Sequence, residues 1–142
     1  MTDRSPRTPD DQADLFQTYL DLPSHRLFGL RLLSAKEGVS QLTFETSNAA
    51  LVPGGYVHGG VSSLLMEPAA MIALVTVLAA DRWTVTSTSE YRMLRAVPQG
   101  SDVLLEGRVA RVGRHLAHVD VALTIDGVPH VEGRFVKSII PA

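Results

Sequence analysis

The distribution of apolar and polar positions divides the chain into segments of two different periods. Between Thr8 and Pro23 the apolar residues recur at helical spacing, and Thr8-Pro9 matches an N-cap followed by a first-turn proline. Residues 61–80 are almost wholly apolar, which predicts a helix from about Gly59 that is buried on every side. After Asp81 apolar and polar residues alternate, which is typical of β-strands.

The alternating segments predict an antiparallel sheet. Hairpin signals occur at Glu37-Gly38 and, more strongly, at Asp126-Gly127. A sheet built from hairpins must bury one face, and the long apolar helix is the element available to cover it. The sequence therefore predicts the α+β class, with the sheet wrapped around one helix and a short N-terminal helix beside it. Strands are expected at 26–38, 39–47, 83–93, 101–113, 114–125 and 128–140, with strict alternation of the two faces along 83–92.

The length and composition are those of one globular domain. A chain of 142 residues has room for a single domain over residues 9–142, after a disordered tail over residues 1–8. The net charge of −2 gives no indication of nucleic-acid binding. The absence of cysteine excludes disulfides, thiolate metal sites and a cysteine nucleophile, and it suits a reducing cytoplasm. No secretory signal is visible at the N-terminus, so we expect a cytoplasmic location.

The apolar run 61–80 has the length of a membrane span. Glu67 and Pro68 lie near its middle, and amphipathic strands that need a helix to pack against follow directly. These features favour a buried helix, so no membrane partner is expected.

The segment "GGYVHGGVSSLLMEPAA", residues 54–70, carries the candidate chemistry. A run that only filled a core would have no use for His58 or Glu67, and a buried carboxylate is costly unless it is paired. The first N–H groups of a helix lack intrahelical partners and carry the positive end of its dipole, so they suit a developing oxyanion. The lack of a Cβ at Gly59 and Gly60 lets a ligand approach this backbone closely.

The same residues resemble a known family. His58-Gly59-Gly60, with nine positions from the histidine to Glu67, is similar to the hot-dog thioesterases of the phenylacetate-degradation and 4-hydroxybenzoyl-CoA type, in the branch with glutamate. "YRMLRAVPQG" and "RVARVGRHLAHVDVAL" extend the resemblance over roughly residues 25–138. It implies a hot-dog fold, hydrolysis of an acyl-CoA, Gly59 N–H as oxyanion donor, and Glu67 as either nucleophile or general base. It implies no cofactor, coenzyme A being part of the substrate.

Further site residues follow from this resemblance. Thr86 falls where other members have a serine that assists water, and His58 is expected to take part in the site directly. The family usually has Gln or Asn at the position of Val52, a role that Asn48 could take here, and often Ser or Thr at the position of Met71.

An arginine-rich stretch supplies candidate contacts for coenzyme A. Its three phosphates suit charge-assisted hydrogen bonds, for which we single out Arg95 and Arg114. By contrast, His115 and His118 lie three apart on a predicted strand and therefore face opposite sides, so no zinc site is expected.

The helix geometry predicts a dimer. Nine residues of helix span about 13.5 Å and two and a half turns, so the helix start and Glu67 point to opposite sides. Two antiparallel copies of the chain could bring one Gly59 to the other copy's Glu67. We therefore expect a homodimer with two shared sites, and a dimer of dimers by resemblance.

Two other functions remain open at this level. A 3-hydroxyacyl thioester dehydratase of the same fold also pairs a histidine with a helix glutamate, although the two residues are usually further apart in its sequence. Val52 and Met71 instead favour a non-catalytic acyl-CoA-binding protein.

Overall fold

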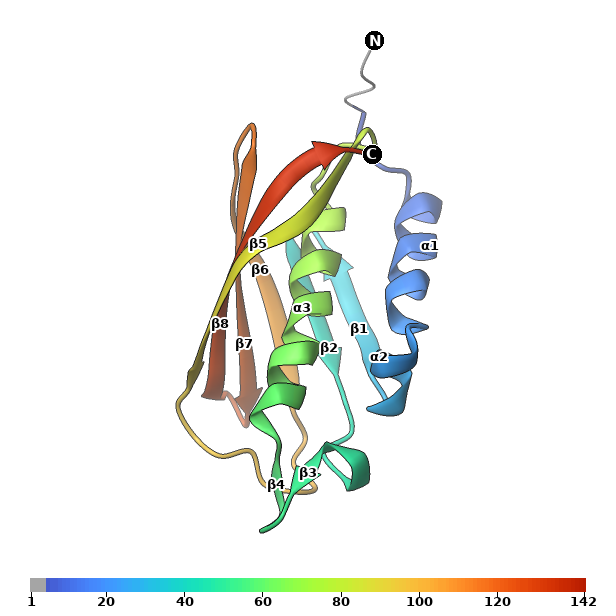
Figure 1. Cartoon of the computed structure of the whole chain (residues 1–142). Helices are drawn as coiled ribbons and strands as arrows, with labels where there is room; N and C mark the ends of the chain where they lie inside the picture. Colours follow the sequence, from blue (N-terminus) through green and yellow to red (C-terminus); the bar gives the residue numbers. More distant parts are fainter. Residues whose placement is uncertain (1–4) are drawn as a thin grey trace.

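A computed structural model describes residues 5–142 as one long helix lying along a six-stranded antiparallel sheet (Figure 1). The helix, α3, spans Gly59–Val75. The sheet order β1-β2-β6-β7-β8-β5 leaves β1 and β5 at its edges. The α+β class and the hot-dog arrangement of a sheet wrapped around a helix are thereby confirmed. The strands are β1 (Arg31–Lys36), β2 (Val39–Thr43), β5 (Arg82–Met93), β6 (Leu104–Val112), β7 (Leu116–Ile125) and β8 (Val128–Pro141).

Both predicted hairpin turns are confirmed. Glu37-Gly38 joins β1 to β2, and Asp126-Gly127 joins β7 to β8. In each turn both residues have positive φ: 51° and 80° in the first, 51° and 75° in the second. This is the pattern of a two-residue turn whose twist matches that of the strands.

Two helices, rather than one, precede the sheet. α1 (Pro9–Leu20) begins at the predicted Thr8 N-cap, where the Thr8 hydroxyl accepts from the Asp11 N–H at 3.2 Å. The helix was expected to run on to about Pro23, but Pro23 opens a second helix, α2 (Pro23–Leu27). Proline suits that first-turn position because its missing N–H is not needed there. The first strand therefore begins at Arg31 and not at the expected residue 26.

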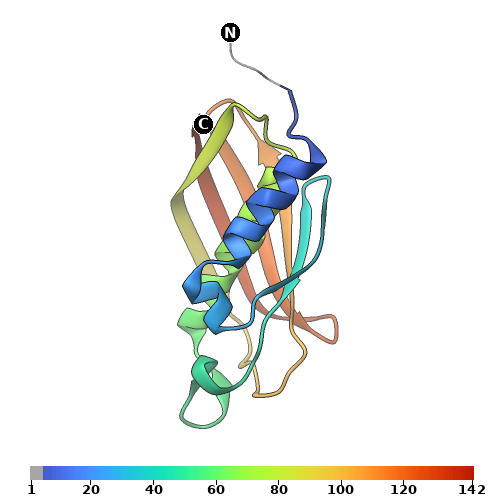
Figure 2. The same cartoon turned by 90° about the vertical axis from the view of Figure 1, so that its right-hand side faces the viewer.

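The helix α3 lies between the sheet and α1 (Figure 2). Its packing against β6 depends on Gly107, where an added Cβ would lie 2.5 Å from the Ala69 carbonyl oxygen. The neighbouring Ser40 hydroxyl donates to that oxygen at 2.6 Å. The helix and the sheet therefore approach at backbone contact beside the middle of α3.

The segment between β2 and α3 contains some regular structure. A 3₁₀ turn (Asn48–Ala50) is followed by two short paired strands, β3 (Leu51–Val52) and β4 (Tyr56–Val57). The His58 N–H donates to the Ala50 carbonyl at 2.7 Å, so this segment sets where α3 begins.

The N-terminal segment differs in part from the expected tail. Arg7 is buried, and its guanidinium donates to the carbonyls of Leu78, Ala79 and Arg82 at 2.6–3.1 Å. Residues 5–8 are therefore held against the end of α3, which corrects the expectation of a disordered tail there. Residues 1–4 lie outside the described residues.

The length of α3, 17 residues, bears on the membrane alternative. No helix in the part of the chain that the structure describes has the length and apolarity that a bilayer span requires.

Candidate active site

The N-terminus of α3 is organised by His58. Its Nδ1 accepts a hydrogen bond from the Gly60 N–H at 2.8 Å, so the imidazole caps the helix. The Gly59 N–H lies one residue earlier, and within residues 5–142 no acceptor is recorded for it. One donor at the positive end of the helix dipole is thus available to a ligand.

Gly59 and Gly60 differ in what an added side chain would contact. A Cβ on Gly60 would lie 2.9 Å from the His58 Nδ1 and would displace the cap. A Cβ on Gly59 would meet only the end of Met93, at 3.5 Å, an ordinary contact. The His58 cap therefore requires glycine at position 60, whereas the space beside Gly59 is not used by the described part of the chain.

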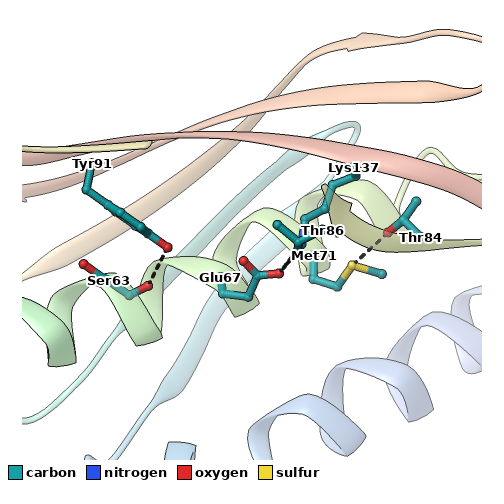
Figure 3. Close-up of polar contacts among 7 residues, drawn as sticks. All are labelled: Ser63, Glu67, Met71, Thr84, Thr86, Tyr91 and Lys137. Atoms are coloured by element: carbon teal, nitrogen blue, oxygen red, sulfur yellow. Dashed lines mark hydrogen bonds and ion pairs between the residues drawn. The ribbon is translucent and has the colours of Figure 1, made fainter. Parts of the chain in front are cut away.

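Glu67 lies two turns further along α3, next to β5 and β8 (Figure 3). Its Oε1 accepts from the Thr86 hydroxyl and forms an ion pair with the Lys137 ammonium. Lys137 Nζ also donates to the Thr86 hydroxyl at 2.6 Å, so the three groups form a closed triangle. The predicted pair of Glu67 and Thr86 is thus brought together.

The strand β5 contains a bulge directly after Thr86. Thr86 pairs with Lys137 and Thr88 with Val136, so Ser87 is an extra residue in β5. The predicted strict alternation along residues 83–92 is therefore wrong at this point. A bulge shifts the pairing by one residue and re-aims the side chains that follow.

The side chains of β5 that contact α3 demonstrate the shift (Figure 3). Before the bulge the even-numbered Thr84 faces the helix, and its hydroxyl donates to the Met71 sulfur at 3.2 Å. After the bulge the odd-numbered Tyr91 does so, its hydroxyl donating to the Ser63 carbonyl at 3.3 Å. Thr84 thus supplies a hydroxyl next to Met71, where the family often has Ser or Thr on the helix itself.

Two tyrosines face the same region. Burial, and then the negative charge of Glu67, raise the pKa of Tyr19 on α1 to about 12. Burial is also the main cause that raises the pKa of Tyr91, with the Glu67 charge adding to it and a hydrogen bond with Ser89 acting against it. Both phenols are therefore neutral near pH 7, and Lys137 is the cation that contacts Glu67 within residues 5–142.

The other predicted residues occupy different places. Arg95 lines a cavity of about 280 Å³ together with Gly59 and Met93, and its guanidinium donates to the Pro129 carbonyl at 2.7 Å. Arg114 lines another cavity, with Leu78 near the C-terminal end of α3. The exposed Asn48 begins the 3₁₀ turn, with a positive φ of 49°. Within one chain, these three residues therefore do not lie around Glu67.

Sequence reasoning missed Lys137. A signal was present, because Val131, Phe135 and Lys137 share the parity of one buried strand face. A lysine on that face opposite the single carboxylate of the apolar helix indicates an ion pair. Among the residues that the structure describes, no group of three or more His, Asp or Glu side chains could hold a metal ion.

Comparison with solved structures supports the assignment of the fold. Thioesterase PA1618 from Pseudomonas aeruginosa, in its Q49A mutant form, superposes with a TM-score of 0.82 at 21% identity, covering 98% of this chain and 99% of that one. Zebra fish thioesterase superfamily member 2 gives 0.81 at 25% identity, over 93% and 98%. The protein smu.793 from Streptococcus mutans UA159, bound to acetyl CoA, gives 0.73 at 22% identity, over 80% and 90%. No curated protein sequence matches the chain significantly.

The helix, the sheet and these superpositions define a hot-dog protein. The sequence model of the thioesterase superfamily matches residues 54–129, more than half of the chain. This protein belongs to the thioesterase superfamily.

Proposed function

We propose that this protein hydrolyses the thioester bond of an acyl-CoA or aroyl-CoA, with Glu67 acting on the substrate or on water. The observation that carries the proposal is the state of the Glu67 carboxylate. Its side chain is 39% exposed although it stands on a largely buried helix, and Lys137 and Thr86 both contact the same oxygen. A carboxylate that is held by one oxygen and open to solvent suits general-base or nucleophilic chemistry.

Two routes use the same groups. In the general-base route, Glu67 takes a proton from water while the water oxygen bonds to the thioester carbonyl carbon. In the nucleophilic route, Glu67 itself bonds to that carbon, the coenzyme A thiolate leaves, and water then cleaves the mixed anhydride. In both routes the carbonyl oxygen gains negative charge, the C–S bond breaks, and the departing thiolate ends as a thiol by taking up a proton.

The Gly59 N–H is the proposed donor to that carbonyl oxygen. Support comes from its free donor, its place at the positive end of α3, and the open space next to it. One such donor contributes about 3–4 kcal/mol in the transition state.

Arg95 is the proposed contact for a phosphate group of coenzyme A. It shares the cavity of Gly59, and its guanidinium uses one recorded hydrogen bond, which leaves donors for an anion. A coenzyme A group is also present in two similar structures, smu.793 bound to acetyl CoA and a hypothetical thioesterase from Streptococcus pneumoniae TIGR4. Arg114 lies in a different cavity, so within one chain the proposal relies on Arg95.

A homodimer with shared sites is part of the proposal. Gly59 and Glu67 are separated by about 12 Å along α3, too far for one carbonyl to reach both. The strand β5 carries Thr86 and lies at an edge of the sheet, with the residues from Val85 to Glu90 exposed. A long edge strand is a template for pairing with another strand, and pairing two copies of β5 would close both sites.

A thiol-release assay on a panel of acyl-CoAs tests the function. The chain has no cysteine, so a thiol reagent reads only the released coenzyme A. The matched control is Glu67→Gln, which leaves the buried Lys137 a polar partner. Glu67→Ala would leave that ammonium unpaired and endanger the fold.

We expect thiol release by the wild-type protein and loss of release in Glu67→Gln with an unchanged circular dichroism spectrum. Equal rates in the two proteins would refute the catalytic role of Glu67. A change in enoyl absorbance without thiol release would instead identify a dehydratase, and binding of acyl-CoA without either reaction would identify a binding protein.

A further inference from the structure

Lys137 differs from the other lysine of the chain in its burial. The protein has two lysines and eleven arginines. The Lys36 side chain is 81% exposed and pairs at 3.8 Å with the equally exposed Glu37. The Lys137 side chain is 2% exposed, and its ammonium lies 5.5 Å from the centre of the Phe135 ring. Burying an ammonium is costly, so its presence here requires the partners that hold it.

Those partners leave the two oxygens of Glu67 in different states. The Lys137 ammonium and the Thr86 hydroxyl both bond Oε1, and within residues 5–142 no hydrogen bond to Oε2 is recorded (Figure 3). The carboxylate is thereby fixed on one side and open on the other.

We propose that Lys137 is a positioning residue for catalysis: it fixes Oε1 of Glu67 and so makes Oε2 the oxygen that acts on water or on the thioester. This inference rests on the proposed thioester hydrolysis. It holds for either route, since both need one ionised, correctly aimed oxygen.

Geometry gives the role to Lys137 rather than to another group. The ammonium reaches Glu67 from β8, opposite Thr86 in the strand register, and it bonds both Thr86 and Glu67. Among the described residues, the phenols of Tyr19 from α1 and Tyr91 from β5 also face Glu67, and both are neutral near pH 7. Lys137 is thus the positive charge that contacts Glu67, and the triangle with Thr86 fixes the direction of the carboxylate.

The first test compares Lys137→Met with Lys36→Met. Methionine is similar in length and neutral, and Lys36 serves as the exposed control. In Lys137→Met we expect kcat/KM to fall about 100-fold, mostly in kcat, because a Glu67 carboxylate that is free to rotate is no longer held in the reactive orientation. Lys36→Met should match the wild-type protein.

The second test is rescue of Lys137→Ala by a small cation. Added ethylammonium can enter the space that the side chain leaves and replace its charge, so it should restore part of kcat. Sodium chloride at the same ionic strength should not. A purely structural role for Lys137 would not give this rescue of kcat.

A third measurement does not depend on activity. Because the chain has two lysines, protein labelled with ¹³C-lysine gives two Cε signals. In Glu67→Gln the Lys137 signal should shift, whereas the Lys36 signal should stay in place.

The outcomes are distinguishable from failure of the proposed function. If wild-type protein releases thiol but Lys137→Met keeps its kcat, Lys137 has no positioning role. An unchanged Lys137 signal in Glu67→Gln also overturns the inference, even if Lys137→Met does not fold. If wild-type protein hydrolyses no acyl-CoA, the proposed function fails, and the catalytic role of Lys137 fails with it, whatever the NMR result.

Discussion

The imidazole Nδ1 of His58 accepts the N–H of Gly60 at 2.8 Å, and this contact defines how α3 begins. It uses one backbone donor of the helix start and leaves the preceding one, on Gly59, for a ligand. His58 therefore has a structural role as the N-cap of α3, and this role can be tested separately from a role in catalysis.

Replacing His58 tests that separation. His58→Ala removes the cap and should cost about 1 kcal/mol of unfolding free energy, whereas His58→Asn should keep most of it, since asparagine is a favoured N-cap. Urea denaturation measures both. If His58 acts only as a cap, His58→Asn should also keep its rate of thiol release. A stable His58→Asn protein with no activity would show a direct role in the reaction.

The two glycines after His58 should respond differently to substitution. Gly60→Ala places a Cβ 2.9 Å from the imidazole and should lower stability by about as much as loss of the cap. Gly59→Ala meets only Met93, at 3.5 Å, and should leave stability unchanged. The larger Gly59→Val should lower kcat/KM about 100-fold by displacing the thioester. A Gly59→Val protein with full activity would show that substrate does not approach this backbone.

Mixed dimers test whether sites are shared. Glu67→Gln and Gly59→Val each damage both sites of their own dimer, but a mixed dimer has one site with both changes and one with neither. Random reassortment makes about half of the dimers mixed, so about a quarter of wild-type activity should return after joint refolding. Each variant refolded alone is the control. Recovery no greater than in these controls, with mixed dimers verified by mass, would show that each chain holds a complete site.

Alkaline pH tests the environment of Tyr19. Its ring stacks on Trp83 with centroids 6.3 Å apart, and its pKa in the folded chain is raised from 10.0 to about 12, chiefly by burial. Between these values only the unfolded chain loses the proton, so stability should fall as pH rises from about 10 to about 12. Urea unfolding at a series of alkaline pH values should show a shallower fall in Tyr19→Phe than in Tyr56→Phe, the exposed control. An equal slope in the two variants would contradict the assignment.

Much of the fold could be predicted from local patterns. The apolar run after Gly59 indicated the central helix, and paired positive-φ turns such as Asp126-Gly127 indicated the antiparallel hairpins. The helix α2 was missed because a proline can end one helix and begin the next, and the choice depends on how the chain turns back over the sheet.

Sequence spacing predicted the candidate site only where its residues are close together, and the family resemblance added Thr86. His58, Gly59 and Glu67 belong to one helix and carry their own spacing, whereas Lys137 lies on the last strand. Its meeting with Glu67 depends on strand order and register, which pattern analysis does not supply. The bulge at Ser87 was missed for the same reason, because an extra residue is recognised only against its partner strand.

The bulge at Ser87 also bears on which changes of length this protein tolerates. Deleting Ser87 would restore regular pairing and would leave both Thr86 and Tyr91 on the side of β5 that faces α3, because Ser87 is the extra residue that interrupts the alternation. Inserting a further residue elsewhere in β5 would instead exchange the two faces on one side of the insertion, so that either Thr86 would leave Glu67 or Tyr91 would leave α3. Substitution or loss of Ser87 should therefore be tolerated more readily than other changes in the length of β5. An alignment that passes through β5 without respecting this extra residue would match inward-facing side chains of one protein to outward-facing side chains of another.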